Sequence, residues 1–427
     1  MSILFKNIRS LIGLRPAETK VLKGDELKNL PSINDAWLYI EDGKILEFGA
    51  MKDFSSQFVP DNRDNSELEE VDGSGKFLLP CFCDSHTHLV FADWRQEEFV
   101  NKIKGMSYEE IAARGGGILN SAKKLNETPE EVLLEKAVQL IEEIKNHGTG
   151  AVEIKSGYGL SYEGELKMLR VIQKLKALSP IPVKATFLGA HAIPPEYKDR
   201  REEYIKLLVE KLLPKIAEEK LADYCDVFCE KGFFSPEETD MILQAAWKYG
   251  LKPKIHANQL SVSGGVQAGV RNNAVSVDHL ENIGDEEIAS LKNSNTIPTL
   301  LPSAAFFLRM PYPPARKMID AGLPVALASD YNPGSSPSGR MSFVISLACI
   351  QMGMTPEEAI NAATLNGARA MELEHELGSI AIGKTANLIL TQPLSSLANI
   401  PYHFDRDVIE RVFIAQEVPG TLQSAVT

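Results

Sequence analysis

The chain has 427 residues, a formal net charge of −13 and 44% hydrophobic residues, which is ample for a buried core and unlike a disordered chain. The acidic balance argues against nucleic-acid binding, because there is no basic surplus to replace the counterions of the phosphates. No apolar run reaches the roughly 18 residues that span a bilayer, and the first residues lack the apolar core and cleavage site of a secretory signal. Five scattered cysteines are too few for a disulfide framework. We therefore expect a cytoplasmic globular protein that binds neither nucleic acid nor membrane.

Both ends of the chain have the pattern of β-structure. Residues 36–40 and 45–48 are strand-like and flank Asp42-Gly43, a two-residue turn signal typical of a hairpin. Residues 377–391 return to β character around the turn Gly383-Lys384. The two ends are natural partners for each other. We expect a small composite β-sandwich domain made of residues 1–78 and 378–427, beside a catalytic domain formed by residues 79–377.

Between these ends, strand-like and helix-like runs alternate. A helix is predicted over 128–147, with a capped start at Thr128-Pro129 and a stop at Gly148. Eight strand candidates are present, the number in a (β/α)8 TIM barrel of the α/β class. A doubly wound open sheet also alternates, but it places its site at one switch point rather than at many strand ends. The strand candidates are 76–82, 150–154, 183–188, 224–229, 254–256, 274–277, 296–301 and 324–328, and further helix candidates are 163–177, 202–219, 236–249, 286–293 and 315–321.

The clearest chemical signal is the pair His86 and His88, which follows the first strand candidate. Side chains two residues apart in a strand share a face, so both imidazoles can bind one metal. Alone the pair is a weak signal, because two solvated histidines near a turn give the same pattern. Strand ends of a barrel converge on one mouth, where imidazoles and a carboxylate form a hydrolytic metal site. The other residues at predicted strand ends are His191, His256, His279 and Asp330.

Four other segments are weaker candidates. Gly115-Gly116-Gly117 lacks the strand and the ending of a phosphate loop, and is either a lid near the mouth or a plain turn. Tyr158 follows a strand and either reaches the mouth or caps the core. Residues 332–336 form either an ordinary polar turn or a substrate-binding loop. Cys81 and Cys83 flank the histidine pair, but free cysteines are usually buried, so we interpret them as core residues rather than ligands.

Together these features resemble the amidohydrolase superfamily. The resemblance rests on the His-x-His after the first barrel strand, the later single histidines, the last Asp and the segment GSIAIGKTANLIL. Within the superfamily, the likeness extends over almost the whole chain and is closest to the imidazolonepropionase family, which acts in histidine degradation. The segments that carry it, in order, are DSHTHLVFADWRQEEF, GGGI, VEIKSGYGL, TFLGAH, HANQL, VDHLE and ASDYNPGSSPS.

The resemblance implies one metal ion per chain, Zn²⁺ or Fe³⁺, held by His86, His88, His256 and Asp330. It places His279 next to the nucleophilic water, and it implies a homodimer from the habit of the family. It also implies a set of contacts to a small-molecule substrate. These substrate contacts are Arg95, Tyr158, His191, Gln259, Asn332, Gly334 and Ser335.

The implied reaction is hydrolysis of the cyclic amide C–N bond of 4-imidazolone-5-propanoate to give N-formimidoyl-L-glutamate. A bound metal lowers the pKa of water from about 15.7 towards 7. Asp330 is our choice for the base that takes the proton and delivers it to the leaving ring nitrogen. His279, with His191, is expected to polarise the carbonyl or stabilise its oxyanion. Arg95 suits the propanoate, because a guanidinium binds a carboxylate with two hydrogen bonds, and Tyr158 with the 332–335 loop is expected to orient the substrate.

The chain departs from the family pattern at two places, and three alternatives stay open. Cys81 and Cys83 replace the usual Gly and aliphatic residue, and Gln259 replaces the Glu of some relatives and cannot act as a base. A purine- or pyrimidine-type aminohydrolase is compatible with the same frame but does not need Arg95. A two-metal hydrolase needs a carboxylated lysine after the fourth strand, whereas Lys155 follows the second. A non-enzymatic scaffold is expected to lose ligands, and the sequence has kept them all.

Overall fold

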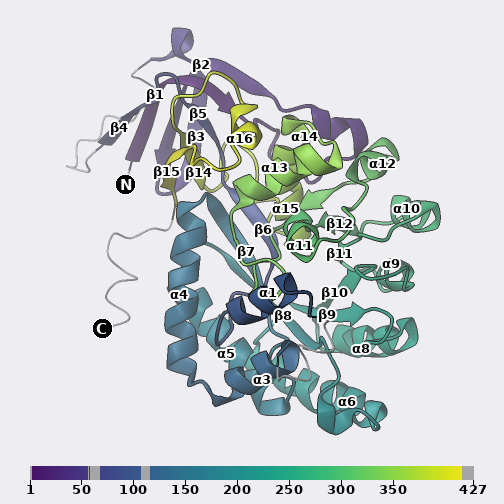
Figure 1. Ribbon diagram of the computed structural model, residues 1–427. Helices are drawn as coiled ribbons and strands as arrows, with labels where there is room; N and C mark the ends of the chain where they lie inside the picture. The colour runs from purple at the N-terminus through teal and green to yellow at the C-terminus, as the bar shows by residue number, and fades with distance from the viewer. Residues whose placement is uncertain (1, 56, 58–67, 107–115, 416–427) are drawn as a thin grey trace.

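The computed structural model describes residues 2–55, 57, 68–106 and 116–415, which form two sheets (Figure 1). One sheet has eight parallel strands that form a barrel, and the other has seven strands and lies beside it. This is the predicted α/β barrel with a second β-unit from the chain ends. No helix within the described ranges is long and apolar enough to cross a membrane.

The barrel strands pair in sequence order, each parallel to the next. The barrel closes through the backbone, because the amide of His88 donates to the carbonyl of Tyr331 (2.9 Å) and the amide of Asp330 donates to the carbonyl of His86 (3.0 Å). We call this junction the seam, and it carries three of the predicted metal ligands. The strands are β6 (Phe82–Thr87), β7 (Thr149–Lys155), β8 (Val183–Ala190), β9 (Tyr224–Cys229), β10 (Lys252–Ala257), β11 (Ser276–His279), β12 (Ile297–Leu300) and β13 (Ala326–Leu327).

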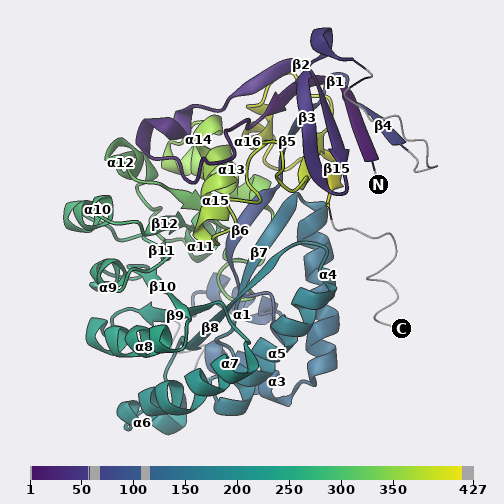
Figure 2. The ribbon, with the colours of Figure 1, turned by 180° about the vertical axis from the view of Figure 1, so that it is seen from behind.

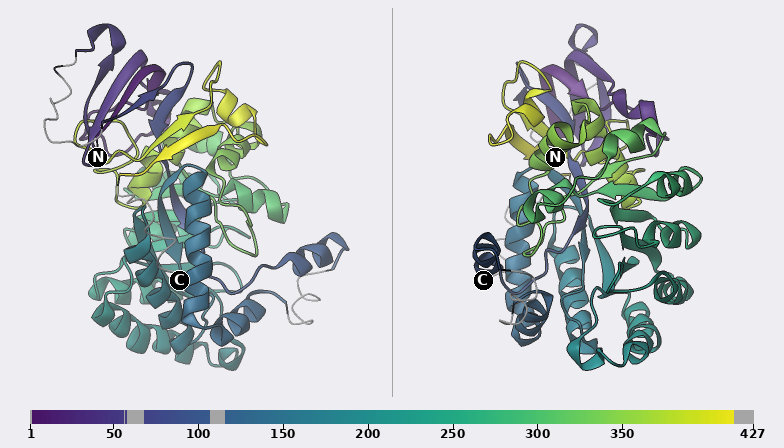
Figure 3. Two further views of the ribbon diagram at one scale, coloured as in Figure 1. Left: turned by 90° about the vertical axis from the view of Figure 1, so that its left-hand side faces the viewer. Right: turned by 45° about the vertical axis from the view of Figure 1, so that its right-hand side comes forward.

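Helices surround the barrel on its outer side (Figures 1 and 2). Several start at capping boxes, as Ser235 and Glu238 do for α8, because these side chains satisfy the free amides of a first turn. The segment Leu207–Leu212 between α6 and α7 is π-helical. The helices are α3 (Ile118–Glu127), α4 (Glu130–Asn146), α5 (Tyr162–Leu178), α6 (Arg201–Lys206), α7 (Leu213–Glu219), α8 (Pro236–Lys248), α9 (Gly265–Arg271), α10 (Asp285–Lys292), α11 (Pro302–Leu308), α12 (Ala315–Asp320), α13 (Met341–Met352), α14 (Pro356–Ala363) and α15 (Leu365–Ala370). Helix α1 (Gln96–Ile103) stands away from this ring (Figure 3).

The second sheet joins the two ends of the chain, as predicted, and its order is β15-β14-β5-β1-β2-β3 with β4 against β1. The N-terminal and C-terminal parts of this sheet meet where β5 pairs with β14, and Figure 2 shows the strands from both chain ends together at the top of the molecule. The Asp42-Gly43 turn joins β2 to β3 as the predicted hairpin. The second sheet has an apolar core of its own, which includes Phe5, Leu38 and Leu388. The elements are β1 (Ser2–Ile12), β2 (Ser32–Glu41), β3 (Lys44–Ala50), β4 (Leu68–Asp72), β5 (Phe77–Pro80), β14 (Leu388–Thr391), α16 (Asn399–Tyr402) and β15 (Ile409–Phe413).

One strand assignment was wrong. The run 76–82 is not the first barrel strand, because β5 pairs with β1 and β14 in the second sheet. The first barrel strand, β6, begins at Phe82 after the single residue Cys81. Leu78 packs in the core of the second sheet, whereas Phe77 and Leu79 pack in the large core of the barrel. This short strand therefore serves two cores, which gives it the continuous apolar pattern of a buried barrel strand.

The other strand predictions agree with the structure to within a few residues, and so do the predicted helices, apart from the π-helical turn. Other helices were not predicted, namely α1, α3, α9, α11, α13, α14, α15 and α16. Gly115, the first residue of the suggested lid, lies outside the described residues. Cys81 and Cys83 are buried and free, as expected.

Candidate metal centre and active site

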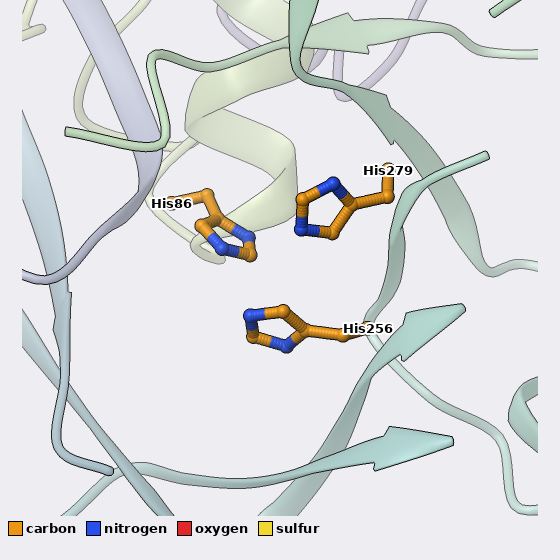
Figure 4. Close-up of side chains that lie close together, drawn as sticks. All are labelled: His86, His256 and His279. Atoms are coloured by element: carbon orange, nitrogen blue, oxygen red, sulfur yellow. The ribbon is translucent and has the colours of Figure 1, made fainter. Parts of the chain in front are cut away.

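The histidines predicted at strand ends converge inside the barrel. His86 comes from β6, His256 from β10 and His279 from the end of β11. The ring centroids of His86 and His256 are 4.5 Å apart, and those of His86 and His279 are 5.5 Å apart. Figure 4 shows the three rings directed toward one point. His88 shares the face of His86, as the pleat of a strand requires, with ring centroids 5.4 Å apart.

Asp330 brings a carboxylate to the same point. Its Oδ1 lies 3.5 Å from His86 Nε2 and 3.7 Å from His88 Nε2. Ligand atoms on one tetrahedral metal with bonds of about 2.1 Å are roughly 3.4 Å apart, so this spacing fits a metal ion. Within the described residues, His86 Nε2 is buried without a hydrogen-bond partner. Two candidate ligand sets, each with its atoms within 4.8 Å, are His86, His256 and His279, and His86, His88 and Asp330.

Two buried carboxylates, which the sequence analysis missed, orient two of these rings. His86 Nδ1 lies 2.7 Å from Asp278 Oδ2, and His256 Nδ1 lies 3.0 Å from Asp226 Oδ2. A carboxylate accepts, so the bond to Asp278 puts the proton of His86 on Nδ1 and leaves its Nε2 for a metal, while Asp226 Oδ1 also accepts the backbone amide of His256 (3.0 Å). The sequence did contain a signal: Asp226 and Asp278 are charged residues inside runs that were correctly predicted as buried strands.

Burial favours the neutral form of three imidazoles, those of His86, His88 and His191. Burial and then the charge of Lys155 hold the pKa of His86 well below its ordinary value, and burial and then His191 do the same to the pKa of His88. Neutral imidazole is the form that binds metal. Burial also lowers the pKa of His191 to about 3. His191 Nδ1 donates to the carbonyl of Gly157 (3.0 Å), so its Nε2 is left as an acceptor.

His279 is in a different environment. Its backbone φ is 85°, a left-handed conformation that is costly for a residue with a side chain and is found at functional sites. Its Nδ1 lies 3.3 Å from Glu281 Oε1. Burial lowers the pKa of His279, but the neighbouring charge of Glu281 outweighs burial and raises the pKa above its ordinary value. A ring protonated on both nitrogens can donate a hydrogen bond into the site.

The cluster opens into a cavity of about 500 Å³. Every predicted site residue lines this cavity except His86, which is fully buried beneath it. The structure therefore brings together the whole predicted set. Sequence reasoning missed the apolar part of the lining and one cation, Lys102 of α1, because nothing in their local patterns points to a pocket. The missed lining residues are Lys102, Ile118, Phe228, Phe233, Leu260, Leu308 and Met310.

Arg95 lies at the edge of the cavity, where one of its guanidinium nitrogens is held by a neighbouring residue and another has no partner among the described residues. Its Nε donates to Ser121 Oγ (2.8 Å), and its guanidinium lies 5.6 Å from the ring centre of Tyr158. Within the described residues, Nη2 is buried and has no hydrogen-bond partner. A buried, unpartnered guanidinium nitrogen is suited to an anionic ligand, because leaving it unpaired has a free-energy cost.

The 332–335 loop is built around its own side chains. Asn332 Nδ2 donates to Ser335 Oγ (2.6 Å), and Asn332 Oδ1 accepts the amides of Gly334 (2.7 Å) and Ser335 (2.9 Å). Asn332 lines the cavity, but its amide group is occupied in shaping the loop. Ser335 Oγ donates to Asp330 Oδ2 (2.8 Å), which leaves Oδ1 facing the histidines.

Lys155, the residue considered for a two-metal site, lies below the cluster. Its Nζ is 2.6 Å from Glu153 Oε1 and 2.9 Å from Asp226 Oδ2, and its side chain is fully buried. Burial lowers the pKa of Lys155, but the surrounding carboxylates outweigh burial and raise it. A carboxylated lysine has to form from a neutral amine, so this environment does not favour a bridging ligand.

Comparisons of the sequence give one family and a set of full-length relatives. The model of the amidohydrolase family matches residues 77–418. The chain is 55% identical over 418 residues to an imidazolonepropionase of Flavobacterium johnsoniae, with 98% of this chain and 100% of that protein covered. It is 41% identical over 402 residues to an imidazolonepropionase of a Geobacillus species, with 94% of each covered.

Solved structures of similar fold come from other enzymes. E. coli guanine deaminase matches with a TM-score of 0.72 and 14% identity, over 98% of each chain. An adenosine deaminase of Xanthomonas campestris with bound zinc matches with a TM-score of 0.65 and 15% identity, over 99% of this chain and 96% of that one. At these identities the likeness shows a shared fold.

Proposed function

The chain belongs to the amidohydrolase family and has the activity of the imidazolonepropionases, and we propose how its residues carry out that reaction. The reaction adds water to the cyclic amide of 4-imidazolone-5-propanoate and opens the ring to N-formimidoyl-L-glutamate in histidine degradation. The observation that carries the proposal is the convergence of four histidines and Asp330 at one cavity, which also holds a guanidinium nitrogen with no partner among the described residues.

We assign the metal to His86, His88, His256 and Asp330, as one Zn²⁺ or Fe³⁺ per chain. The spacing of the Asp330 and histidine atoms and the unpartnered Nε2 of His86 support this set. Imidazole and carboxylate ligands suit both ions. When bound, such a metal lowers the pKa of a water molecule and thereby supplies the nucleophile.

Asp330 is our proposed base. Its Oδ1 faces the histidines and is the atom that we assign to the metal, whereas Oδ2 accepts one hydrogen bond from Ser335 Oγ and keeps a second lone pair for the proton of the attacking water. Burial raises the pKa of Asp330, against the opposing charge of His279, and a raised pKa makes the carboxylate a stronger base. The same oxygen then returns the proton to the ring nitrogen as the C–N bond breaks.

The two remaining histidines of the cavity have separate roles in this proposal. His279, whose pKa is raised beside Glu281, donates a hydrogen bond to the carbonyl oxygen as negative charge develops there. His191 is neutral, with its Nδ1 proton committed to Gly157, so it accepts a hydrogen bond from an N–H of the substrate ring. This division favours a binding role for His191 over the carbonyl-polarising role expected from the sequence.

Arg95 is assigned to the propanoate carboxylate through its free Nη2. Tyr158 and Gln259 line the cavity, and we assign them to the walls that orient the ring. Gly334 leaves room for the guanidinium, since a Cβ at this position would lie 2.6 Å from Arg95 Nη1. An acidic chain that binds an anion needs such a local cation.

The test is to follow loss of the imidazolone absorbance with purified enzyme and to identify formimidoylglutamate as the product. The matched control is His86→Ala, which removes a ligand without touching the cavity wall. Guanine and adenosine serve as comparison substrates, and deamination of either in preference to imidazolone turnover would favour the aminohydrolase alternative. Metal content adds a second readout: one ion per chain supports the assignment, two support a bridged site, and none contradicts both.

A cytoplasmic location, a homodimer and the absence of nucleic-acid or membrane partners stay predictions, and so do the domain limits at residues 78 and 377.

A further inference from the structure

Below the metal site, the barrel interior holds a layer of charged side chains where aliphatic residues usually pack. Glu153 and Lys155 of β7, Asp226 of β9, Lys254 of β10 and Asp278 of β11 all have fully buried side chains. Three carboxylates and two ammonium groups give this layer one formal negative charge. Ions removed from water in this way are stable only when each is paired and hydrogen-bonded.

Lys155 is at the centre of the layer. Its Nζ lies 2.6 Å from Glu153 Oε1, 2.9 Å from Asp226 Oδ2 and 3.5 Å from Asp278 Oδ2. Asp226 and Asp278 are the two carboxylates that contact the Nδ1 atoms of the metal-site histidines. One ammonium group therefore connects the two histidine–carboxylate pairs, although they come from different strands.

Lys254 provides a comparison within the same layer. It is equally buried and pairs with Glu153, and its Nζ also lies 3.5 Å from the carbonyl of Ser85. Among the described residues, it forms no ion pair with Asp226 or Asp278. Loss of either lysine would remove one buried positive charge, but only Lys155 touches the carboxylates behind the histidines.

We propose that Lys155 is a positioning residue for the metal centre. Its ammonium group contacts both Asp226 and Asp278 and holds them in place, and these carboxylates fix the rings of His86 and His256 with Nε2 directed at the metal. Without the ammonium group, the two carboxylates are no longer held together, so one turns away and its histidine loses a fixed orientation. This inference rests on the proposed ligand set, but Lys155 itself touches neither metal nor substrate.

The test compares the zinc affinity of Lys155→Met and Lys254→Met. The metal is removed with a chelator, and the dissociation constant for Zn²⁺ is measured by competition with a chromogenic chelator, so no substrate is involved. Lys155→Met should weaken zinc binding by about 10- to 100-fold, the usual effect of losing a partner behind a metal ligand. Lys254→Met should lower the melting temperature of the metal-free chain but leave the zinc dissociation constant close to that of the parent.

A second pair of variants covers the case in which Lys155→Met does not fold. Glu153→Gln with Lys155→Met removes one charge of each sign and keeps the formal charge of the layer, and Glu153→Gln alone is its control. The proposal requires weak zinc binding in the double variant and near-parent binding in the control. Equal affinities in the two chains, or an equal loss in Lys155→Met and Lys254→Met, would overturn it while leaving the ligand set intact. A parent chain that takes up no zinc would overturn both.

Discussion

Replacing Arg95 with Met should weaken productive binding of the substrate and leave the metal in place. The guanidinium is fixed by Ser121 through Nε, while Nη2 is buried and unpartnered within the described residues. A charge-assisted hydrogen bond contributes about 1.5–3 kcal/mol, which corresponds to a loss of roughly 10- to 150-fold in kcat/KM. Arg95→Lys should recover only part of the lost kcat/KM, because lysine keeps the positive charge but cannot form the two parallel hydrogen bonds of a guanidinium.

The assay measures kcat/KM for the imidazolone propanoate and for its carboxylate ester in both proteins, which closes a double-mutant-type cycle. The kcat/KM for the ester should fall little when Arg95 is replaced, because the ester makes no charge-assisted contact with Arg95 in the parent enzyme. Gly334→Ala should act in the same direction by raising KM, since its Cβ would displace the guanidinium. An equal loss for acid and ester would refute the reasoning, because it would show that Arg95 does not bind the carboxylate. Arg95 could instead have paired with the nearby Glu97 or Glu98 on the surface, but neither ion pair forms among the described residues, and its Nε donates to Ser121 instead.

Three further outcomes are expected. His86→Ala and His256→Ala should each lose metal and activity but keep the fold, as judged by metal analysis and circular dichroism; full metal occupancy in either would contradict the ligand assignment. Asp330→Asn should lower kcat by roughly 10²–10⁴ in metal-loaded enzyme, and a kcat within a few-fold of the parent would mean that another group is the base. The metal-free chain should lose stability as the pH falls below about 6.5, because unfolded His191 takes up a proton there whereas in the fold its pKa is about 3. Thermal unfolding between pH 5 and 7 should therefore depend less steeply on pH in His191→Gln, by up to about 1.4 kcal/mol per pH unit, and an unchanged slope would show that His191 is already charged in the fold.

The barrel and the convergence of the strand-end histidines with Asp330 could be predicted because they depend on the order of the elements along the chain, whereas contacts such as Arg95 and Gln259 were implied by the family resemblance. Alternating runs give the strand count, and the topology of a barrel brings every strand end to one mouth. His256 and Asp330 could thus be placed together although they are far apart in sequence. The β5–β6 boundary could not be predicted in this way, because Leu78 and Phe82 belong to one apolar run and only tertiary pairing divides it between two sheets.

The sequence alone could not predict which way the polar atoms of individual side chains point. Asn332 was expected to contact substrate, but its amide is committed to its own loop, a local competition that depends on backbone geometry. His191 was expected to polarise a carbonyl. Its bond to the carbonyl of Gly157 places the ring proton on Nδ1, so Nε2 faces the cavity as an acceptor. Asp226 and Asp278 were missed because they lie inside strands, and the search had been confined to strand ends.

The seam affects the order in which the protein can mature during synthesis. Translation proceeds from the N-terminus, and His86 and His88 emerge with the first barrel strand, long before their partners across the seam. The backbone bonds from Asp330 and to Tyr331 cannot form until the eighth strand has left the ribosome. Until then β6 has an open edge on one side, and the nascent chain holds histidines without the carboxylate that completes the set. We therefore expect a product of interrupted translation that ends before Asp330 to be inactive, because it lacks the proposed carboxylate ligand and base.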